Sequence, residues 1–272
     1  MTEPDSGPAS LSELADRWRS DLESWAIPDR ILAQAPESPW IHPVSMFTVD
    51  DDIAASHSHD VARAALPAGG SVLDVGSGGG RASLALVPPA GLLVAVDHQQ
   101  GMLDAFTAAA ERRGVATRTV LGDWPAVADE VAECDVVVCH HVAYNVADIV
   151  PFLKALDERA RHRVVLEIPQ VHPLSGMNPL WKQFWDLDRP VRPTADDLAA
   201  IARALGFDVH LDAWQDESWG ARVTLPDDER VRFARVRLCL TEDRDAEVAA
   251  ALIAQSDAQP RQVATLWWDV SS

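Results

Sequence analysis

Basic residues are scarce in this chain. Lysine and arginine together number 23, against 42 aspartate and glutamate residues, which gives a formal net charge of −19. Proteins that bind nucleic acid use clustered lysine and arginine to contact phosphates, and no run of basic residues occurs here. The charge therefore disfavours both nucleic acid and anionic membrane lipid as partners.

Cysteines and long apolar stretches are also few. Three cysteines occur, Cys134, Cys139 and Cys239, and their spacing matches no zinc or disulfide pattern. We expect buried free thiols in a reducing compartment. No stretch reaches the roughly 18 apolar residues of a membrane span, and the first residues, MTEPDSGPAS, lack the basic and apolar parts of a secretion signal. The expectation is a soluble, cytoplasmic protein.

Histidines give little sign of a metal site. His57 and His59 form an H-x-H pair, but no third metal-binding side chain is suitably spaced nearby. Structural and catalytic zinc sites need at least three protein ligands. No metal is therefore predicted.

Short apolar segments alternate with helical segments from residue 71 onward. Strands are predicted at 71–75, 92–97, 117–123, 135–141, 162–169 and 206–214, with 261–270 as a candidate seventh. Runs that are apolar throughout are typical of parallel strands that are covered on both faces. The pattern predicts an α/β fold with a doubly wound, mostly parallel seven-stranded sheet.

The segments outside this alternation are mainly helical. Apolar residues spaced by three or four between Leu11 and Trp25 predict an amphipathic helix, with Ser10 or Ser12 as its N-cap. We expect residues 1–54 to form an N-terminal helical cap or lid and residues 55–272 to form the main domain.

Two further segments are assigned less specific roles. Residues 170–193 interrupt the alternation after the fifth strand and are interpreted as an insertion that helps to cover a ligand crevice. Residues 215–260 are helix-like over 228–254 and could either pack on the core or form the face of a homodimer.

A glycine-rich loop, Asp74-Val75-Gly76-Ser77-Gly78-Gly79-Gly80, follows the first strand. Glycines let a ligand approach the backbone closely, and the helix behind them offers free N–H groups. A dinucleotide loop of the form G-x-G-x-x-G would need glycine at position 81, which is Arg81. The loop reads D-x-G-x-G-x-G instead. In this form it resembles the first motif of class I S-adenosylmethionine-dependent methyltransferases.

The resemblance continues along the chain, over residues 55–170. Asp97 ends the second strand and is followed by His98-Gln99-Gln100-Gly101-Met102, which resembles the second motif of the family. The acid there accepts hydrogen bonds from the ribose hydroxyls, and later residues pack on the adenine. Gly122-Asp123-Trp124 resembles the adenine-contacting stretch, and residues 135–145 resemble the fourth-strand motif beneath the transferred methyl group.

The resemblance implies a Rossmann-like methyltransferase fold, S-adenosylmethionine as cofactor and S-adenosylhomocysteine as product. Its motifs assign cofactor binding to Asp74, Gly76, Ser77, Gly78, Gly80, Asp97, His98, Met102, Gly122, Asp123, Trp124 and His140.

Two histidines and the only tyrosine lie where the fourth strand ends. Adjacent strand residues point to opposite faces, so His140 is expected to face the cofactor and His141 the acceptor. Histidine titrates near neutral pH, and His141 could therefore act as a general base. Tyr144 could hold or deprotonate the acceptor. Alternatively, both histidines could cap a helix or bind backbone, and Asn145 could bind the acceptor or cap the next helix.

Aromatic side chains are concentrated in the predicted insertion. His172, Trp181, Phe184 and Trp185 could form a wall for a flat or apolar acceptor. Trp181 and Trp185 are four residues apart and can share one helix face, which could equally pack against the edge of the sheet.

We therefore predict a methyltransferase that transfers a methyl group directly to an oxygen, nitrogen or other nucleophile of a small molecule. The fourth-strand stretch His-His-Val-Ala-Tyr departs from the N/D-P-P-Y/F sequence of relatives that methylate DNA bases. It resembles instead the bacterial small-molecule enzymes of the class. Two alternatives remain: a nicotinamide-dependent oxidoreductase, and a cofactor-binding protein without catalytic activity.

Overall fold

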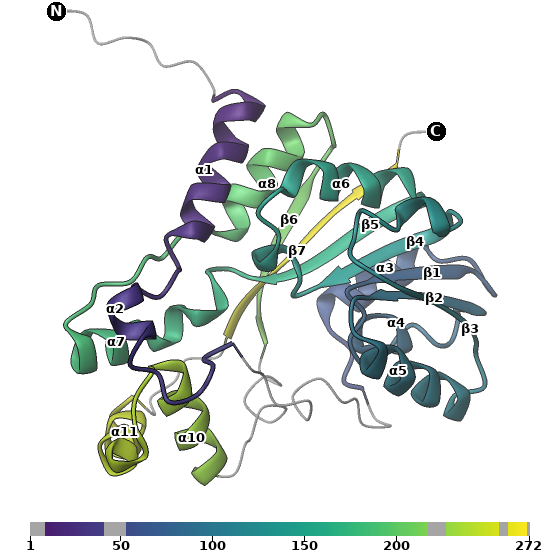
Figure 1. Cartoon of the computed structure of the whole chain (residues 1–272). Coiled ribbons are helices and arrows are strands. Elements are labelled where there is room, and N and C mark those ends of the chain that lie inside the picture. Colours follow the sequence, from purple (N-terminus) through teal and green to yellow (C-terminus); the bar gives the residue numbers. More distant parts are fainter. Residues whose placement is uncertain (1–8, 41–52, 217–226, 256–260, 271–272) are drawn as a thin grey trace, which may run out of the picture.

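A seven-stranded sheet forms the centre of the protein and carries helices on both faces (Figure 1). The computed structural model describes residues 9–40, 53–216, 227–255 and 261–270. The strands are β1 (Ser71–Val75), β2 (Leu92–Asp97), β3 (Ala116–Leu121), β4 (Cys134–His140), β5 (Ala160–Pro169), β6 (His210–Asp216) and β7 (Arg261–Asp269).

The strand order is β3-β2-β1-β4-β5-β7-β6. Strand β7 runs antiparallel to both β5 and β6, and the pairs among β1 to β5 are parallel. The predicted α/β fold with a mostly parallel seven-stranded sheet is confirmed. Strand order reverses between β1 and β4, and open α/β sheets bind ligands outside the carboxyl ends of the strands at such a point.

The described helices are distributed over the two faces and one end of the sheet (Figure 1). They are α1 (Leu11–Glu23), α2 (Asp29–Leu32), α3 (His57–Ala65), α4 (Arg81–Leu84), α5 (Gln100–Arg112), α6 (Ile149–Glu158), α7 (Asn178–Trp185), α8 (Ala195–Ala204), α10 (Asp227–Arg237) and α11 (Asp245–Ala254).

Alternating strand residues build two separate cores, one on each face of the sheet. Leu73 of β1 packs with Phe152 of α6 on the face that α1, α6 and α8 cover. Its neighbour Val72 packs with Phe106 of α5 on the face that α3, α4 and α5 cover. Burial on both faces explains why the strands are apolar throughout.

Helix α1 belongs to the first of these cores. Ser10 caps the helix in a capping box with Glu13, as one of the two predicted N-caps. Trp18 is 1% exposed, and its indole N–H donates to the carbonyl of Val146 at 2.8 Å. The role of residues 1–54 as a lid stays a prediction, but α1 packs on the core of the sheet.

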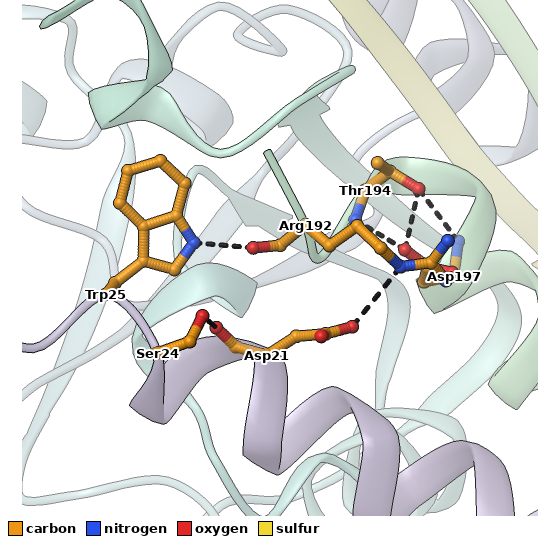
Figure 2. A network of polar contacts seen from close by, with 6 residues as sticks. All are labelled: Asp21, Ser24, Trp25, Arg192, Thr194 and Asp197. Carbon is orange, nitrogen blue, oxygen red and sulfur yellow. Dashed lines mark hydrogen bonds and ion pairs between the residues drawn. The ribbon is translucent and has the colours of Figure 1, made fainter. Parts of the chain in front are cut away.

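The end of α1 is joined to the start of α8 by a polar network (Figure 2). The indole N–H of Trp25 donates to the carbonyl of Arg192 at 2.5 Å. The Arg192 guanidinium contacts Asp21 and Asp197, and Asp197 in turn accepts from the backbone N–H and hydroxyl of Thr194. The N-terminal helix and the segment after the insertion are thus held together.

A third apolar cluster lies to one side of the sheet, where α2, α7, α10 and α11 meet (Figure 1). Trp181 packs in it, and the indole N–H of Trp185 donates to the carbonyl of Leu238 at 2.7 Å. The insertion therefore packs on the C-terminal helices, and the alternative that Trp181 and Trp185 pack against the sheet edge is wrong. The helix-like stretch 228–254 corresponds to α10 and α11.

Some local predictions also differ from the structure. Helix α6 begins at Ile149 with Asp148 at its N-cap position, so Asn145 does not cap it. Asn145 lies in a short 3-10 turn, Ala143–Asn145, because the chain turns once before the helix starts. Residues 41–52, 217–226 and 256–260 lie outside the described part of the chain.

The structure also bears on the cysteines and on membrane-spanning helices. Cys134, Cys139 and Cys239 are free thiols, and all three are buried. In the described part of the chain, no helix combines the length and apolar character needed to cross a membrane.

Candidate functional site

The glycine loop turns sharply at the carboxyl end of β1. Gly76 and Gly78 have φ angles of 68° and 50°, in the left-handed region that favours glycine. A Cβ on Gly76 would lie 2.4 Å from Cγ2 of Val142, whereas a Cβ on Gly78 would meet no atom within 4 Å. Gly76 thus permits close packing against the end of β4, and Gly78 faces open space that a ligand can use.

Asp97, at the end of β2, is only 7% exposed. Its carboxylate accepts the backbone N–H of Gly78 and that of Gln99, each at 2.9 Å. An ionised carboxylate offers about four acceptor positions, so two remain for the hydroxyl groups of a ribose. The residue therefore shapes the loop and can also bind a sugar.

The residues assigned to the adenine lie around the ends of β2 and β3. Met102 is 7% exposed in the first turn of α5, and the side chain of His98 is 63% exposed. Asp123 is exposed beyond the end of β3. The indole N–H of Trp124 donates to the carbonyl of Phe152 at 3.4 Å, so its ring packs toward α6.

Asp74 is buried beneath the loop at 1% exposure. Its Oδ2 accepts the hydroxyl of Ser83 at 2.6 Å, while Oδ1 has no hydrogen-bond partner among the described residues. Burial raises the pKa of Asp74 to about 7. A buried polar atom without a partner is costly, and a ligand that supplies one is therefore stabilised here.

His140 and His141 both approach one carboxylate, that of Glu167 at the end of β5. Nδ1 of His140 lies 3.9 Å from Oε2 of Glu167, and Nε2 of His141 lies 3.1 Å from Oε1. The prediction that the two histidines point apart is wrong. His141 has a φ of 62°, so the chain leaves the extended strand geometry before this residue.

These three side chains differ in exposure and charge. His140 and Glu167 are 6% and 4% exposed, whereas His141 is 28% exposed. Burial lowers the pKa of His140 to about 3, although the neighbouring carboxylate of Glu167 opposes this shift. Burial by itself raises the pKa of Glu167, but its contacts with His140 and His141 outweigh this and hold the pKa well below the usual range.

Helix α3 closes the other side of Glu167. The Ser56 hydroxyl donates to Oε2 of Glu167 at 2.8 Å, and Nδ1 of His59 accepts the Ser56 backbone N–H at 2.9 Å. The ring centroids of His59 and His140 are 5.3 Å apart. Sequence reasoning missed Ser56, His59 and Glu167 as a group.

Glu167 was the only member of the Ser56, His59 and Glu167 group that the sequence pattern could have indicated. Glu167 interrupts an otherwise apolar strand, VVLEIP, and a charged residue in a buried strand is a candidate functional residue. Nothing in the local pattern links it to Ser56, which lies far away in the chain. Across the described residues, no three histidine, cysteine or acidic side chains form a metal-binding group.

Tyr144 lies deeper than predicted, at 5% exposure. Its hydroxyl donates to the carbonyl of Pro169 at 2.8 Å, and burial raises its pKa far above the usual range. His172 lies against Tyr144 edge-on and is stacked on Trp25 with ring centroids 3.9 Å apart. Asn145 is exposed beside this group.

The predicted aromatic wall continues into the third apolar cluster. The guanidinium of Arg189 lies over the rings of Trp25 and Trp181, at 5.5 and 5.1 Å from their centroids. These side chains, with Met177, line a small cavity of about 10 Å³. That is room for about one water molecule. Trp181 therefore lines a nearly filled space.

The residues around the loop fit S-adenosylmethionine. Gly78 offers open space, Asp97 retains acceptor positions, and the buried Oδ1 of Asp74 and Nε2 of His140 have no partner among the described residues. These groups lie at the strand ends on both sides of the switch between β1 and β4. A ligand with a sugar, an amine and a carboxylate complements such a set.

Comparison with known proteins agrees with this interpretation. Residues 72–162 match the family described as methyltransferase domain. A search of the curated proteins found no match to the chain.

Several solved structures share the fold. A methyltransferase from Thiobacillus denitrificans, in complex with S-adenosyl-L-homocysteine, is 18% identical with a TM-score of 0.53 and covers 82% of this chain and 94% of that chain. Magnesium protoporphyrin IX methyltransferase from Synechocystis PCC 6803, with the same product bound, is 15% identical with a TM-score of 0.50, covering 98% and 90%. YjhP from E. coli is 16% identical with a TM-score of 0.54, covering 84% and 98%.

The family match spans β1 to the start of β5, the part of the sheet that carries the glycine loop, Asp97 and the two histidines. The match favours a methyltransferase over the nicotinamide-dependent alternative. Residues 72–162 form a class I S-adenosylmethionine-dependent methyltransferase domain, and its cofactor is S-adenosylmethionine.

Proposed function

We propose that this enzyme methylates a small molecule at a protic oxygen or nitrogen, with His141 as general base. One observation carries the proposal: His141 stands partly exposed at the end of β4, beside the switch point, and contacts the buried carboxylate of Glu167 at 3.1 Å. When bound, S-adenosylmethionine supplies a methyl carbon on a positively charged sulfur, which is open to direct displacement.

The protein's own task is then orientation and proton removal. Holding the two reactants in line can contribute several kcal/mol to the barrier reduction, and a placed base adds a further factor of about 10² to 10⁴. His141 is a suitable base because a carboxylate behind the ring stabilises the imidazolium that forms. Tyr144, buried and bonded to Pro169, is assigned to packing beneath the acceptor rather than to proton transfer.

Cofactor binding is proposed for the residues that surround the loop and the ends of β2 and β3. These are Asp74, Gly76, Ser77, Gly78, Gly80, Asp97, His98, Met102, Gly122, Asp123, Trp124 and His140. Acceptor binding is proposed for Asn145 and His172, which lie beside the end of β4, and for the more distant Trp181 and Trp185. Trp25 joins them because its ring stacks on His172.

Charge and shape favour a small acceptor over nucleic acid. The net charge of −19 opposes a phosphate backbone. The stacked rings of Trp25 and His172, with Tyr144 at the edge, would instead favour a flat acceptor.

Two measurements test the proposed function. Calorimetry of the purified protein with S-adenosylhomocysteine should show binding, and NADH, as the control, should give no heat of binding. The protein is then incubated with methyl-labelled S-adenosylmethionine and, in parallel, with pools of phenols, carboxylic acids and amines, with total RNA and with DNA.

Label is expected in the small-molecule pools and absent from nucleic acid. Transfer of label to RNA or DNA would overturn the choice of acceptor class. Binding of S-adenosylhomocysteine without transfer to any pool would instead support a cofactor-binding protein that lacks catalytic activity.

A further inference from the structure

Arg189 lies between α7 and α8, and its guanidinium is placed between two aromatic rings. Its Cζ lies 5.5 Å from the ring centroid of Trp25 and 5.1 Å from that of Trp181. The two terminal nitrogens donate to the backbone carbonyls of Ala26 and Trp25, just beyond the end of α1. A guanidinium has more N–H groups than these two carbonyls use, and the buried Nε of Arg189 has no partner among the described residues. Hydrogen-bonding capacity therefore remains on a cation that is held in one place.

No carboxylate among the described residues compensates the charge of Arg189. The acidic residues that precede it closely in the sequence, Asp186 and Asp188, both contact Nζ of Lys182, at 2.9 and 3.0 Å. Acidic residues outnumber basic ones in the chain by 42 to 23, so their scarcity is not the reason. Burial lowers the pKa of Arg189, because the partly buried cation loses hydration. A buried cation without an opposite charge is costly, and an anionic ligand that supplies the charge is stabilised beside it.

Arg189 also lines the small cavity of about 10 Å³, which has room for about one water molecule. The described residues of its lining include Trp25, Trp181 and Arg237, and none of them is acidic. Arg237 is 5% exposed, and burial lowers its pKa as well. Trp40 in the lining is 51% exposed, so the cavity lies at the surface of the protein. Its volume fits one oxygen atom of a carboxylate better than the larger phosphate or sulfonate group.

The ring of Trp25 separates this cavity from the end of β4. Its opposite neighbour is His172, which stacks on it with ring centroids 3.9 Å apart and lies edge-on to Tyr144 at 5.3 Å. Tyr144 belongs to the 3-10 turn that follows β4. The indole N–H of Trp25 donates to the carbonyl of Arg192, which fixes the ring in this position (Figure 2). The cavity therefore adjoins the proposed acceptor side of the site, but it lies one ring beyond it.

We propose that Arg189 binds a carboxylate of the methyl acceptor, and that the acceptor is therefore a flat organic acid. This inference rests on the proposed function, which makes a small molecule the acceptor. One carboxylate oxygen enters the cavity, and the rest of the molecule extends past Trp25 toward the end of β4. The carboxylate is a recognition group and keeps its charge, because Trp25 and His172 separate it from the reacting atom. Arginine suits this role, since its planar N–H groups match the geometry of a carboxylate.

The test measures the binding of hydroxybenzoates and hydroxyphenylacetates to the full chain saturated with S-adenosylhomocysteine, by ligand-observed NMR titration. Each acid is paired with its amide, which has nearly the same shape and no charge. The proteins are the wild type, Arg189→Gln, Leu174→Phe and Arg203→Gln. Leu174 lines the cavity, so Leu174→Phe fills it and keeps the guanidinium. Arg203→Gln is the matched control, because it removes an exposed guanidinium that donates to the carbonyl of Val209.

In the wild type, at least one acid should bind at least about tenfold more tightly than its amide, because the hydrogen bonds then join two charged groups. Arg189→Gln and Leu174→Phe should both abolish this preference, and Arg203→Gln should keep it. The inference is overturned if the wild type prefers no acid to its amide, if either cavity variant keeps the preference, or if Arg203→Gln loses it too. Should Arg189→Gln not fold, the Leu174→Phe result decides by itself.

S-adenosylhomocysteine has a carboxylate of its own, and calorimetry with it on the same samples distinguishes the two sources. Its affinity should be equal in all the proteins. A loss of about tenfold or more in Arg189→Gln would assign the carboxylate at Arg189 to the cofactor and overturn the inference.

The methyl-label experiment separates this inference from the proposed function. Transfer of label to small molecules, without any preference for an acid over its amide, would mean that the inference alone fails. A preference for acids that depends on Arg189, without transfer of label to any small molecule, would mean that the proposed function fails while Arg189 remains a carboxylate site.

Discussion

Nε2 of His141 lies 3.1 Å from Oε1 of Glu167, so the residue that directly follows β4 is held by a residue near the end of β5. Parallel neighbours in a sheet bring their carboxyl ends to one edge. Strands β4 and β5 are parallel, and His140 of β4 is paired with Glu167 of β5. The contact places a partly exposed imidazole against a buried negative charge, beside the crevice expected to hold the cofactor.

Asp97 provides a test of the cofactor site. Asp97→Ala removes both the predicted ribose contact and the acceptor of the Gly78 N–H, so affinity for S-adenosylhomocysteine should fall by about 1–3 kcal/mol. Asp97→Asn, which keeps one acceptor oxygen and the shape, should lose less. Calorimetry measures both, and equal affinity in the wild type and Asp97→Ala would remove Asp97 from the site.

Gly78 and Gly114 form a matched pair for testing the loop. Both have positive φ angles, 50° and 67°, and at neither would an added Cβ meet an atom within 4 Å. Alanine at either position should therefore reduce stability by a similar amount, about 1–2 kcal/mol for left-handed strain. Only Gly78→Ala should also weaken binding of S-adenosylhomocysteine. If Gly114→Ala weakens binding equally, the effect is strain and not contact with the ligand.

Gly76 differs from Gly78 because a neighbouring side chain occupies the space that a Cβ on Gly76 would need. A Cβ there would lie 2.4 Å from Cγ2 of Val142. Gly76→Ala should therefore lower the melting temperature more than Gly78→Ala does, since overpacking adds about 1–3 kcal/mol to the strain. Combining it with Val142→Ala should restore part of the loss. A double variant no more stable than Gly76→Ala would show that the close approach to Val142 is not the cause.

His141→Ala should separate catalysis from cofactor binding. With an acceptor found by the labelling screen, turnover should fall by a factor of about 10² to 10⁴, the usual contribution of a general base. Affinity for S-adenosylhomocysteine should change little. His57→Ala, which removes an exposed imidazole of the same kind, is the control and should leave both quantities as in the wild type. Equal losses of turnover and affinity in His141→Ala would indicate a structural role.

His172 makes stability depend on acid pH. Burial, with a smaller effect of Arg189, lowers its pKa to about 4 from 6.5. The unfolded chain therefore takes up a proton as pH falls below about 6.5, while the folded protein does not until about 4. The contribution of neutral His172 to the free energy of unfolding is fully present above about pH 6.5. It falls as the pH drops from about 6.5 to about 4, by up to roughly 3 kcal/mol.

His172→Phe keeps a ring against Trp25 and removes the titrating group. Urea unfolding at about pH 7 and about pH 4.5 should show a smaller acid-induced loss of stability in this variant than in the wild type. The comparison uses the difference between the two pH values, because the variant also loses the bond from the Leu174 N–H. An equal difference in both proteins would exclude His172 as the source.

Much of the fold could be predicted from local patterns. The apolar runs at residues 71–75 and 92–97 became β1 and β2 with the predicted bounds, because a strand buried on both faces must be apolar throughout. The apolar residues between Leu11 and Trp25 predicted α1, since apolar residues recur every three or four positions along an amphipathic helix. Helix ends were harder to predict. Asn145 was a candidate cap, but α6 starts at Ile149 because a 3-10 turn precedes it.

The sequence by itself determined the class of the protein, because the glycine loop and Asp97 are short-range features whose meaning depends only on the strand before them. Only the tertiary structure decided which groups meet at the proposed acceptor side of the site. Glu167 and Ser56 are far apart in the chain and carry no shared pattern, so their contact exists only once α3 has packed on β5. The direction of the His141 side chain likewise depends on its left-handed backbone conformation, which is held by a hydrogen bond to the carbonyl of Glu167. The alternation of residues along a strand does not predict this conformation.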